Sequence, residues 1–489
     1  MDAEGAGFLM ILRMVLFVVS MGLCLAQAPA GTDELVADVL RDWNVPGLAL
    51  GVVRNGAVVH QKGYGLRDVD KKLPVTEGTS FLYGSITKSL TVLLLQTLAA
   101  EGKVDWDAPV RDQLPGFKLS DPVASERATP RDLVSHRTGM PRHDGLWVVP
   151  EPPTQEEMLA RLRFLPASAD FRTTYQYNNL MFVTAGMLGA RAGGGAWEAL
   201  LRKRVLEPLE LGELAATYGE VKGRAELAVA YTQTGDAYRA VRVSPRRLDV
   251  IAPAGAAAGT IGALTKYLLV HMNSGKVNGR QALPAAYFAT MRTPLTPMPA
   301  TGADSPFSAA QAYGMGLFIG RYQGRTMIYH TGTISGYHAM MWWMPEEKLG
   351  VTVLLNRVER AAPHILALTL ADRMLGLAAT DWSAVYKKAV RPPVEPAKPV
   401  SGTRPGHPLA HYAGEYFHGG YGRVSVTENG GVLAFVLAGE KSELKHFHYD
   451  SFLAGTERVT FHTDSDGMVS SVEMRLEPAV PPIVFVRKR

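Results

Sequence analysis

A serine and a lysine three residues apart are the first residues whose types and spacing could do chemistry. Ser85 and Lys88 lie in the stretch Gly84-Ser85-Ile86-Thr87-Lys88, at the start of a long apolar segment. Residues at positions i and i+3 share one face of a helix, so the amine can lie over the hydroxyl. A serine hydroxyl needs a base to become a nucleophile, and a lysine can serve once burial lowers its pKa. A serine cap beside a solvated lysine is the alternative that so short a pattern leaves open.

The segment after Lys88 predicts the helix that would position this pair. Residues 90–101 are rich in leucine and alanine, contain no proline, and end at Gly102, a common helix stop. The segment is apolar on most sides, as a helix buried in a core should be. Free backbone N–H groups at its start could also face an oxyanion. One helical turn would then supply the nucleophile, the base and part of an oxyanion hole.

Two later stretches could complete a hydrolase site. Tyr177 and Asn179 stand at the start of an expected helix at 178–192, and His330-Thr331-Gly332 ends an expected strand that runs into Thr333. The tyrosine could relay a proton to the leaving group, while the asparagine amide holds a substrate carbonyl. The strand could align an acyl substrate and add one N–H to the oxyanion hole. A lone histidine is more often structural than catalytic, but three such motifs in this order indicate one site.

The elements that must position these residues follow an α+β order. Strands are expected at 46–53 and 57–65, and then mostly helices as far as residue 275. The character changes at 313, where strands recur up to 356 before a helix at 361–377. This order predicts an antiparallel sheet built from both ends of the domain, because no regular βαβ alternation is present. The further helices are expected at 34–43, 155–164, 195–206 and 262–275, and the later strands at 313–318, 326–330, 338–344 and 350–356.

The C-terminal part of the chain predicts a separate domain. Residues 390–408 contain six prolines, so we interpret 378–408 as a stiff linker. Evenly spaced short strands beyond it favour a small closed or nearly closed β-barrel over 409–489. The expected strands lie near 412–416, 421–427, 432–437, 443–449, 457–463, 469–476 and 482–487.

Composition narrows the class of protein and its compartment. The 489 residues are 47% hydrophobic and 20% charged, which is typical of a globular protein of two or three domains. The net charge of +5 comes without a clustered basic run before residues 487–489, so we expect no nucleic-acid partner. An apolar run at 14–25, followed by Ala26-Gln27-Ala28, predicts a signal peptide over 1–28 and a periplasmic or secreted protein. The alternative is an uncleaved anchor, which would add membrane contact.

The single cysteine, Cys24, lies inside this predicted signal peptide. The mature chain would then carry no disulfide, no thiol nucleophile and no thiolate metal site. The histidines also show no spacing typical of a metal site.

The three motifs together resemble the serine β-lactamase and DD-peptidase superfamily, in its class C-like branch of β-lactamase-related hydrolases. Ser-x-x-Lys, Tyr-x-Asn and Lys/His-Thr-Gly are the three motifs of that family, and residues 81–88, 131–140, 252–255 and 344–346 fit it as well. The resemblance covers roughly residues 34–377. It implies a β-lactamase/transpeptidase-like sheet flanked by helices, with an all-helical subdomain. It also implies catalysis without a cofactor or metal.

The resemblance implies a role for each motif residue. Ser85 would be acylated, Lys88 would be its base, and Tyr177 would pass the proton on. Asn179 would orient the substrate. The strand residues Thr331 and Gly332 would line the substrate, and the backbone N–H groups of Ser85 and Thr333 would form the oxyanion hole.

His330 stands where class C β-lactamases carry lysine. Histidine there resembles DD-carboxypeptidases, D-amino-acid peptidases and family VIII esterases more than dedicated β-lactamases. We therefore predict an exported serine hydrolase that acts on amides or esters through a Ser85 acyl-enzyme, with D-amino-acid-containing peptides as the first substrate class. A small-ester carboxylesterase and a weak β-lactamase are the alternatives among enzymes. A penicillin-recognising sensor and an assembly-forming scaffold are the alternatives without turnover.

The C-terminal domain carries a resemblance of its own. Residues 411–416 resemble the opening strand of lipocalin-like barrels that follow the catalytic domain in peptidases of this branch. In those relatives the barrel restricts access or mediates assembly, so a homo-oligomer is left open here. A passive stabilising domain is the alternative.

Overall fold

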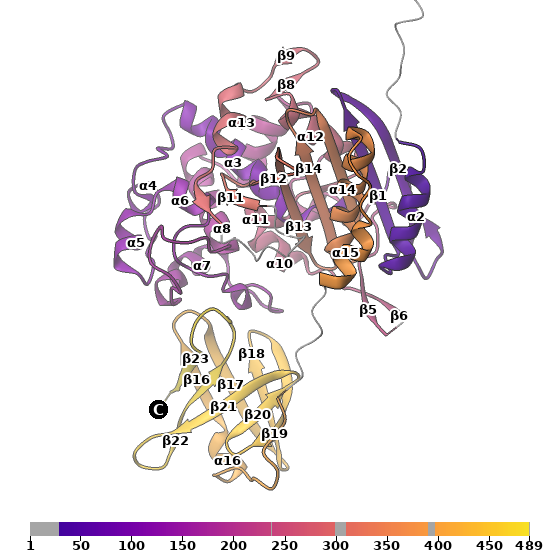
Figure 1. Cartoon of the computed structure of the whole chain (residues 1–489). Helices are drawn as coiled ribbons and strands as arrows, with labels where there is room; N and C mark the ends of the chain where they lie inside the picture. The colour runs from indigo at the N-terminus through magenta and orange to yellow at the C-terminus, as the bar shows by residue number, and fades with distance from the viewer. Residues whose placement is uncertain (1–28, 236, 299–309, 390–396, 489) are drawn as a thin grey trace, which may run out of the picture.

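The structure is a computed structural model that describes residues 29–235, 237–298, 310–389 and 397–488 (Figure 1). The predicted signal peptide at 1–28 lies outside these residues, as does part of the proline-rich segment. Within the described residues, no helix combines the length and the apolar character that crossing a membrane requires.

A nine-stranded antiparallel sheet forms the centre of the larger unit, in the order β10-β11-β12-β13-β14-β15-β1-β2-β3. β1 from the start of the chain pairs with β15, in a register that places Leu50 opposite Val353. The prediction of an α+β fold whose sheet comes from both ends of the domain is confirmed. The strands are β1 (Gly47–Arg54), β2 (Ala57–Asp68), β3 (Leu73–Pro74), β10 (Thr296–Pro297), β11 (Ala310–Tyr313), β12 (Phe318–Tyr322), β13 (Arg325–Ile334), β14 (Tyr337–Met344) and β15 (Leu349–Leu355).

Helices cover both faces of this sheet, as Figure 1 shows for α14 on one side and α12 on the other. Successive residues of a strand point to opposite faces. Trp342 accordingly packs in the core under α2 and α14, whereas Trp343 packs in the core that contains α3 and α12. Every residue of β14 is buried, so the sheet is a fixed middle layer against which α3 and its first turn are held.

A mostly helical part, α4 to α11, lies beside the sheet (Figure 1). The helices are α2 (Thr32–Asp42), α3 (Thr87–Ala100), α4 (Val110–Gln113), α5 (Pro122–Arg127), α6 (Pro130–Val134), α7 (Gln155–Arg161), α8 (Asn179–Gly193), α9 (Trp197–Leu201), α10 (Pro245–Val250), α11 (Ala252–Gly255), α12 (Ile261–Met272), α13 (Ala285–Met291), α14 (Ala361–Leu375) and α15 (Trp382–Ala389). Three short pairs of strands complete the unit: β4 (Phe81–Leu82) with β7 (Ala258–Gly259), β5 (Tyr231–Thr234) with β6 (Ala237–Ala240), and β8 (Lys276–Val277) with β9 (Arg280–Gln281).

Part of the predicted linker at 378–408 is a helix instead. α15 occupies Trp382–Ala389 and packs on the larger unit. Tyr386 is fully buried in the core under α14, and the indole of Trp382 donates to Asp372 over 2.8 Å. Aromatic residues at i and i+4 lie on one helix face, and the prolines that indicated a linker all lie beyond the end of α15.

The expected strand at 313–318 is two strands. Tyr313 ends β11 and Phe318 begins β12, with Gly314 and Gly316 in the turn between them. Gly316 has a φ of +77°, a conformation in which glycine is favoured, so the glycines mark a turn rather than a continuous strand.

The C-terminal unit is a closed barrel of eight antiparallel strands, β16 to β23. The barrel was predicted, but the sequence analysis missed β20, because the turn at Tyr449 and Asp450 contains neither glycine nor proline. The elements are α16 (Leu409–Tyr412), β16 (Gly414–His418), β17 (Gly422–Asn429), β18 (Val432–Leu437), β19 (Glu440–His448), β20 (Ser451–Ala454), β21 (Glu457–Thr463), β22 (Val469–Met474) and β23 (Ile483–Arg487).

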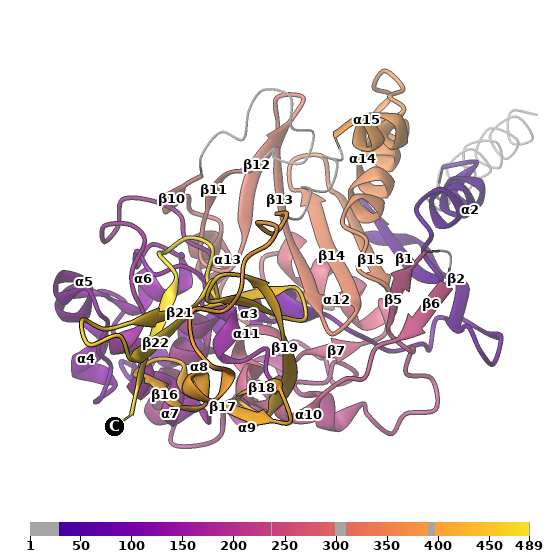
Figure 2. The same ribbon diagram turned by 90° about the horizontal axis from the view of Figure 1, so that it is seen from below.

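The barrel sits against the helical part of the larger unit. Seen from below, it lies in front of that part and away from α2 and α14 (Figure 2). The backbone N–H of Glu151 donates to the carbonyl of Ala438 over 3.0 Å, and Phe164 and Leu165 pack against the turn at Gly419 and Gly420. The barrel therefore contacts the part of the molecule that contains α7 and α8.

Candidate active site

Ser85 stands in a short 3-10 turn, η1 (Gly84–Ile86), that runs directly into α3. Strand β13 presses on this turn. A Cβ atom on Gly332 would lie 1.8 Å from the carbonyl oxygen of Tyr83, and one on Gly84 would lie 2.7 Å from the nitrogen of Thr333. Gly84 also has a φ of +54°. Glycine is needed at both positions because any side chain would push the strand away from the serine.

Lys88 is fully buried, and its Nζ has three oxygen neighbours. Ser85 Oγ lies at 2.9 Å, Asn179 Oδ1 at 2.7 Å and the carbonyl oxygen of Ala254 at 2.9 Å. Amide and carbonyl oxygens only accept hydrogen bonds, so they take two N–H groups of the amine. In the free amine the lone pair is then left for the hydroxyl of Ser85. Burial lowers the pKa of Lys88 well below its usual value, and the nearby Arg142 lowers it further, while Asp144 opposes both.

Tyr177 is the second group that meets the serine oxygen. Its hydroxyl donates to Ser85 Oγ over 2.7 Å. Burial raises the pKa of Tyr177 to about 12, although the Ser85 hydrogen bond and the charge of Arg142 oppose that rise. The phenol therefore keeps its proton at neutral pH, while burial shifts the lysine toward its neutral form. Two groups with pKa values pushed apart around one oxygen are suited to act as acid and base.

Asn179 is the first residue of α8, and its amide orientation is fixed from both ends. Oδ1 accepts from Lys88, and Nδ2 donates to Asp144 Oδ1 over 2.9 Å. A carboxylate only accepts, so the amide nitrogen must face Asp144 and the amide oxygen must face the lysine. Asp144 Oδ2 accepts from Arg142 Nε over 2.6 Å, and the guanidinium of Arg142 lies 4.7 Å from the Tyr177 ring centre.

The sequence analysis missed Arg142 and Asp144. Both follow shortly after the stretch 131–140 that fits the family, in a region for which mostly helices were expected. The sequence did offer one sign of them, because an arginine and an aspartate flank a histidine shortly after that stretch. Their contacts with Tyr177 and Asn179 join residues about 35 apart in the chain, and no local pattern predicts such a pairing.

His330 lies behind the site rather than on the serine. Its Nδ1 bonds the carbonyl of Thr331 over 2.6 Å and its Nε2 bonds the hydroxyl of Tyr313 over 3.0 Å. The carbonyl only accepts, so Nδ1 carries the proton and Nε2 accepts from the tyrosine. Burial lowers the pKa of His330 to about 3, and the ring centre stays 6.5 Å from that of Tyr177. The imidazole is neutral, and its two nitrogens are hydrogen-bonded to Tyr313 and Thr331 rather than to Ser85. The predicted catalytic role of His330 therefore stays a prediction.

The strand residues Thr331, Gly332 and Thr333 lie beyond the end of the β12 pairing and beside the serine. β12 pairs with β13 only as far as Tyr329, whereas β14 pairs with β13 up to Ile334. The other edge of 330–334 faces η1, as the close approach of Gly332 to Ser85 N shows. The backbone nitrogens of Ser85 and Thr333 thus both lie where this strand meets η1. This placement suits the predicted oxyanion hole and the predicted pairing of an extended acyl chain with the strand.

The fold and the site together define a serine hydrolase. The chain belongs to the Beta-lactamase family, whose model matches residues 32–373. A second family model, a domain of unknown function called DUF3471, matches residues 398–485, which include the barrel.

Curated relatives and solved structures agree with this membership. Unguisins hydrolase ungD of Aspergillus violaceofuscus is 30% identical over 437 residues, which are 81% of this chain and 76% of that protein. Unguisins hydrolase ungD' of Aspergillus campestris is 28% identical over 419 residues, or 80% and 76% of the two chains. The octameric penicillin-binding protein homologue from Pyrococcus abyssi has a TM-score of 0.63 at 22% identity, covering 93% of this chain and 99% of that one. SurE, solved with D-Leu, has a TM-score of 0.54 at 21% identity, covering 94% and 99%. At these identities the two structures bear on the fold alone.

Proposed function

We propose that the protein forms an acyl-enzyme at Ser85 on amide or ester substrates and that its preferred substrates are peptides containing D-amino acids. One observation carries the acyl-enzyme: two of the three oxygens around Lys88 Nζ can only accept hydrogen bonds, and the third belongs to Ser85. Burial lowers the pKa of Lys88, and in the free amine these contacts leave the lone pair facing the serine hydroxyl, which is what a general base requires.

Acylation follows from the placement of these groups. Ser85 Oγ bonds to the acyl carbon as its proton passes to Lys88 Nζ, and the carbonyl electron pair moves onto the oxygen. The resulting oxyanion accepts from the backbone N–H groups of Ser85 and Thr333. The bond to the leaving group then breaks as the Tyr177 phenol gives that group its proton, and the proton held by Lys88 restores the phenol. A water molecule repeats the sequence in place of the serine, with the lysine as base, and releases the acyl chain.

The proposed substrate class rests on the relatives and on one charge at the site. The two Aspergillus relatives are named unguisins hydrolases, and SurE was solved with D-Leu. The guanidinium of Arg142 lies over the Tyr177 ring with half of its side chain exposed, so it can also attract a substrate carboxylate. These observations favour a peptide over an uncharged small ester.

A substrate panel tests the proposal. Purified protein is assayed against a D-Ala-D-Ala peptide, D-amino-acid amides and their L counterparts, short p-nitrophenyl esters and nitrocefin. The proposal expects turnover of the D-containing compounds above their L counterparts, with every activity absent from Ser85→Ala. Turnover of the esters alone would replace the peptide by a small ester, and activity that survives in Ser85→Ala would remove the acyl-enzyme.

We also propose that the protein is exported after removal of residues 1–28. The apolar run and the small residues that follow it support this. The N-terminal sequence of the protein recovered from the producing cells tests it. A mature chain that starts near Pro29 supports export, and an intact Met1 in a cytoplasmic fraction contradicts it. Self-association is a further proposal, and light scattering of the purified chain decides it.

A further inference from the structure

His143 joins the C-terminal barrel to the loop beside the active site. It is fully buried, and its two ring nitrogens and its backbone N–H each have a partner. The ring Nε2 bonds the carbonyl of Pro166 over 2.8 Å, and the ring Nδ1 bonds the hydroxyl of Tyr421 over 2.9 Å. The backbone N–H donates to Glu477 Oε2 over 2.8 Å. Two of the three partners, Tyr421 and Glu477, belong to the barrel, and both are buried.

The hydrogen bonds define one protonation state for this histidine. The carbonyl of Pro166 only accepts, so Nε2 must carry the proton. Nδ1 then accepts from Tyr421, whose hydroxyl is the donor. The ring is neutral, and burial lowers the pKa of His143, which agrees with that state. The backbone of His143 has a φ of 46°, a left-handed conformation that is uncommon outside glycine, so its surroundings must hold it there.

The two residues that flank His143 are the ones that reach the catalytic groups. Asp144 fixes the Asn179 amide, whose oxygen accepts from Lys88. Arg142 lies over the ring of Tyr177. A shift of the His143 backbone would therefore move both neighbours at once. The contact with the barrel is one residue away from each of them.

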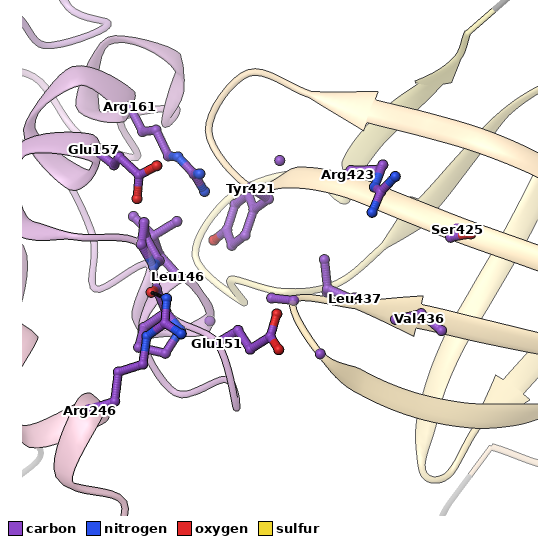
Figure 3. A pocket seen from close by; sticks show the side chains of 16 residues that line it. Leu146, Glu151, Glu157, Arg161, Arg246, Tyr421, Arg423, Ser425, Val436 and Leu437 are labelled. Carbon is purple, nitrogen blue, oxygen red and sulfur yellow. Dashed lines mark hydrogen bonds between the residues drawn. The ribbon is translucent and has the colours of Figure 1, made fainter.

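The barrel holds this loop by these hydrogen bonds and by the close approach of Tyr421 and Leu476 to Gly145. A cavity of about 370 Å³ lies directly beside the contact, lined by residues of both units. Figure 3 shows Tyr421 reaching from the barrel toward the larger unit next to Leu146, with Arg161 and Glu157 on one side of the space and Arg246 and Glu151 on another. Together with the bond to the Pro166 carbonyl, the hydrogen bonds with Tyr421 and Glu477 hold the His143 backbone in place beside this open space.

We propose that Tyr421 and Glu477 of the barrel act through His143 as positioning residues for the catalytic centre, by holding Asp144 on Asn179 and Arg142 over Tyr177. The barrel is then a working part of the hydrolase site rather than only a gate, an assembly surface or a passive domain. A gate would change the reaction of large substrates. Positioning changes the acylation of Ser85 by any reagent, however small. This proposal rests on the acylation of Ser85 proposed above.

The test measures acylation of Ser85 in the full chain by a small uncharged fluorophosphonate, followed by intact-mass spectrometry. Tyr421→Phe removes one hydrogen bond and keeps the ring, and it should slow acylation roughly five- to tenfold. Tyr416→Phe is the matched control, because Tyr416 is a buried barrel tyrosine whose hydroxyl bonds only the carbonyl of Tyr412 within the barrel. The control should match the wild-type rate, and thermal unfolding checks that both variants fold.

Two further comparisons separate positioning from a general loss of structure. Glu477→Ala should slow acylation, and Glu477→Gln, which keeps one carbonyl acceptor, should restore most of the rate. In an Asp144→Asn background, Tyr421→Phe should have little further effect, because both changes act on the same contact with Asn179.

Several results would overturn the proposal. They are equal rates for Tyr421→Phe and Tyr416→Phe, equal losses for the two Glu477 variants, or fully additive effects of Tyr421→Phe and Asp144→Asn. These results concern the barrel alone. A wild-type chain that the reagent does not label at Ser85 would instead remove the proposed function on which the inference rests.

Discussion

Asp132 and Lys88 are both ionisable and fully buried, yet their surroundings differ. The carboxylate of Asp132 on α6 accepts hydrogen bonds from Arg137 Nε over 2.5 Å and from Arg172 over 2.7 Å. It also accepts from the backbone N–H and from the hydroxyl of Thr129, both over 2.9 Å. These hydrogen bonds and charges outweigh the burial and hold the pKa of Asp132 below its usual value. Lys88 on α3 meets only neutral oxygens, so burial dominates and its pKa also falls.

The same direction of shift has opposite meanings for an acid and a base. The carboxyl of Asp132 stays charged at neutral pH, and its partners tie α6 to the turn that contains Arg172. Burial drives Lys88 toward its neutral form. This costs stability, but it gives the amine a lone pair that faces the hydroxyl of Ser85. A buried charge that is paired with opposite charges and hydrogen bonds serves the structure. A buried ionisable group that has no such partners is a candidate for catalysis. Each prediction below tests one side of this contrast.

The largest effect is expected for Lys88→Met. The variant keeps the length of the side chain but removes the base, so acylation of Ser85 should fall by roughly 10²- to 10⁴-fold. The free energy of unfolding should not fall, because methionine carries no amine that burial would penalise. Labelling rates and chemical denaturation check the two parts. A variant that loses stability and activity together would contradict the contrast.

The pH dependence of that stability has a definite sign. The unfolded chain releases the Lys88 proton near pH 10.4, about the usual value, whereas the folded chain releases it at lower pH. Between these two values the unfolded state binds more protons, so the contribution of this group to stability rises with pH. The stability of Lys88→Met relative to the wild type should therefore fall as the pH rises toward about 10.4. A relative stability that does not depend on pH would mean that folding leaves the pKa of Lys88 unchanged.

Tyr177→Phe should have the next largest effect. Loss of the phenol removes the proton donor on Ser85 Oγ and should slow turnover by roughly 10²-fold. The alkaline limb of the rate should not change below pH 10, because the pKa of Tyr177 is about 12. Turnover against pH for the variant and the wild type measures both. An unchanged rate would remove the tyrosine from proton transfer.

Asp132→Asn should act on stability and leave the chemistry in place. Removal of one member of a buried ion pair leaves Arg137 without its partner and should cost about 3 kcal/mol. The folded pKa of Asp132 is lowered, so its stabilisation is complete above the unfolded value near pH 3.9 and is lost as the pH falls through the folded value. Denaturation at pH 7 and pH 3 should show a smaller difference at pH 3. A loss of acylation without a loss of stability would contradict the structural role.

The smallest effect is expected for His330→Gln. The amide can accept from Tyr313 and donate to Thr331, so the rate should change less than about tenfold. The acid limb of the pH profile should not move, because the pKa of His330 lies at about 3. If a limb near pH 6.5 vanished with the histidine, the imidazole would be a proton carrier after all.

Local patterns predicted much of this arrangement. The Ser85–Lys88 pair was predicted because one helical turn brings them together whatever the rest of the chain does. The start of α6 has a local cause as well, because Thr129 caps the helix and Pro130 occupies its first position. By contrast, the pairs Asp144–Asn179 and His143–Tyr421 join distant residues, and the second crosses two domains. Nothing near Asp144 in the sequence indicates which amide it will meet.

The central claim is that Lys88 is a free amine aimed at Ser85 when the enzyme works. The most direct measurement is the rate of Ser85 acylation by a neutral fluorophosphonate between pH 5 and 11, followed by intact-mass spectrometry of the wild type. The account predicts a rate that rises and levels off well below the usual lysine pKa of about 10.4. A rate that keeps rising until about pH 10.4, as an ordinary exposed lysine would give, would contradict it.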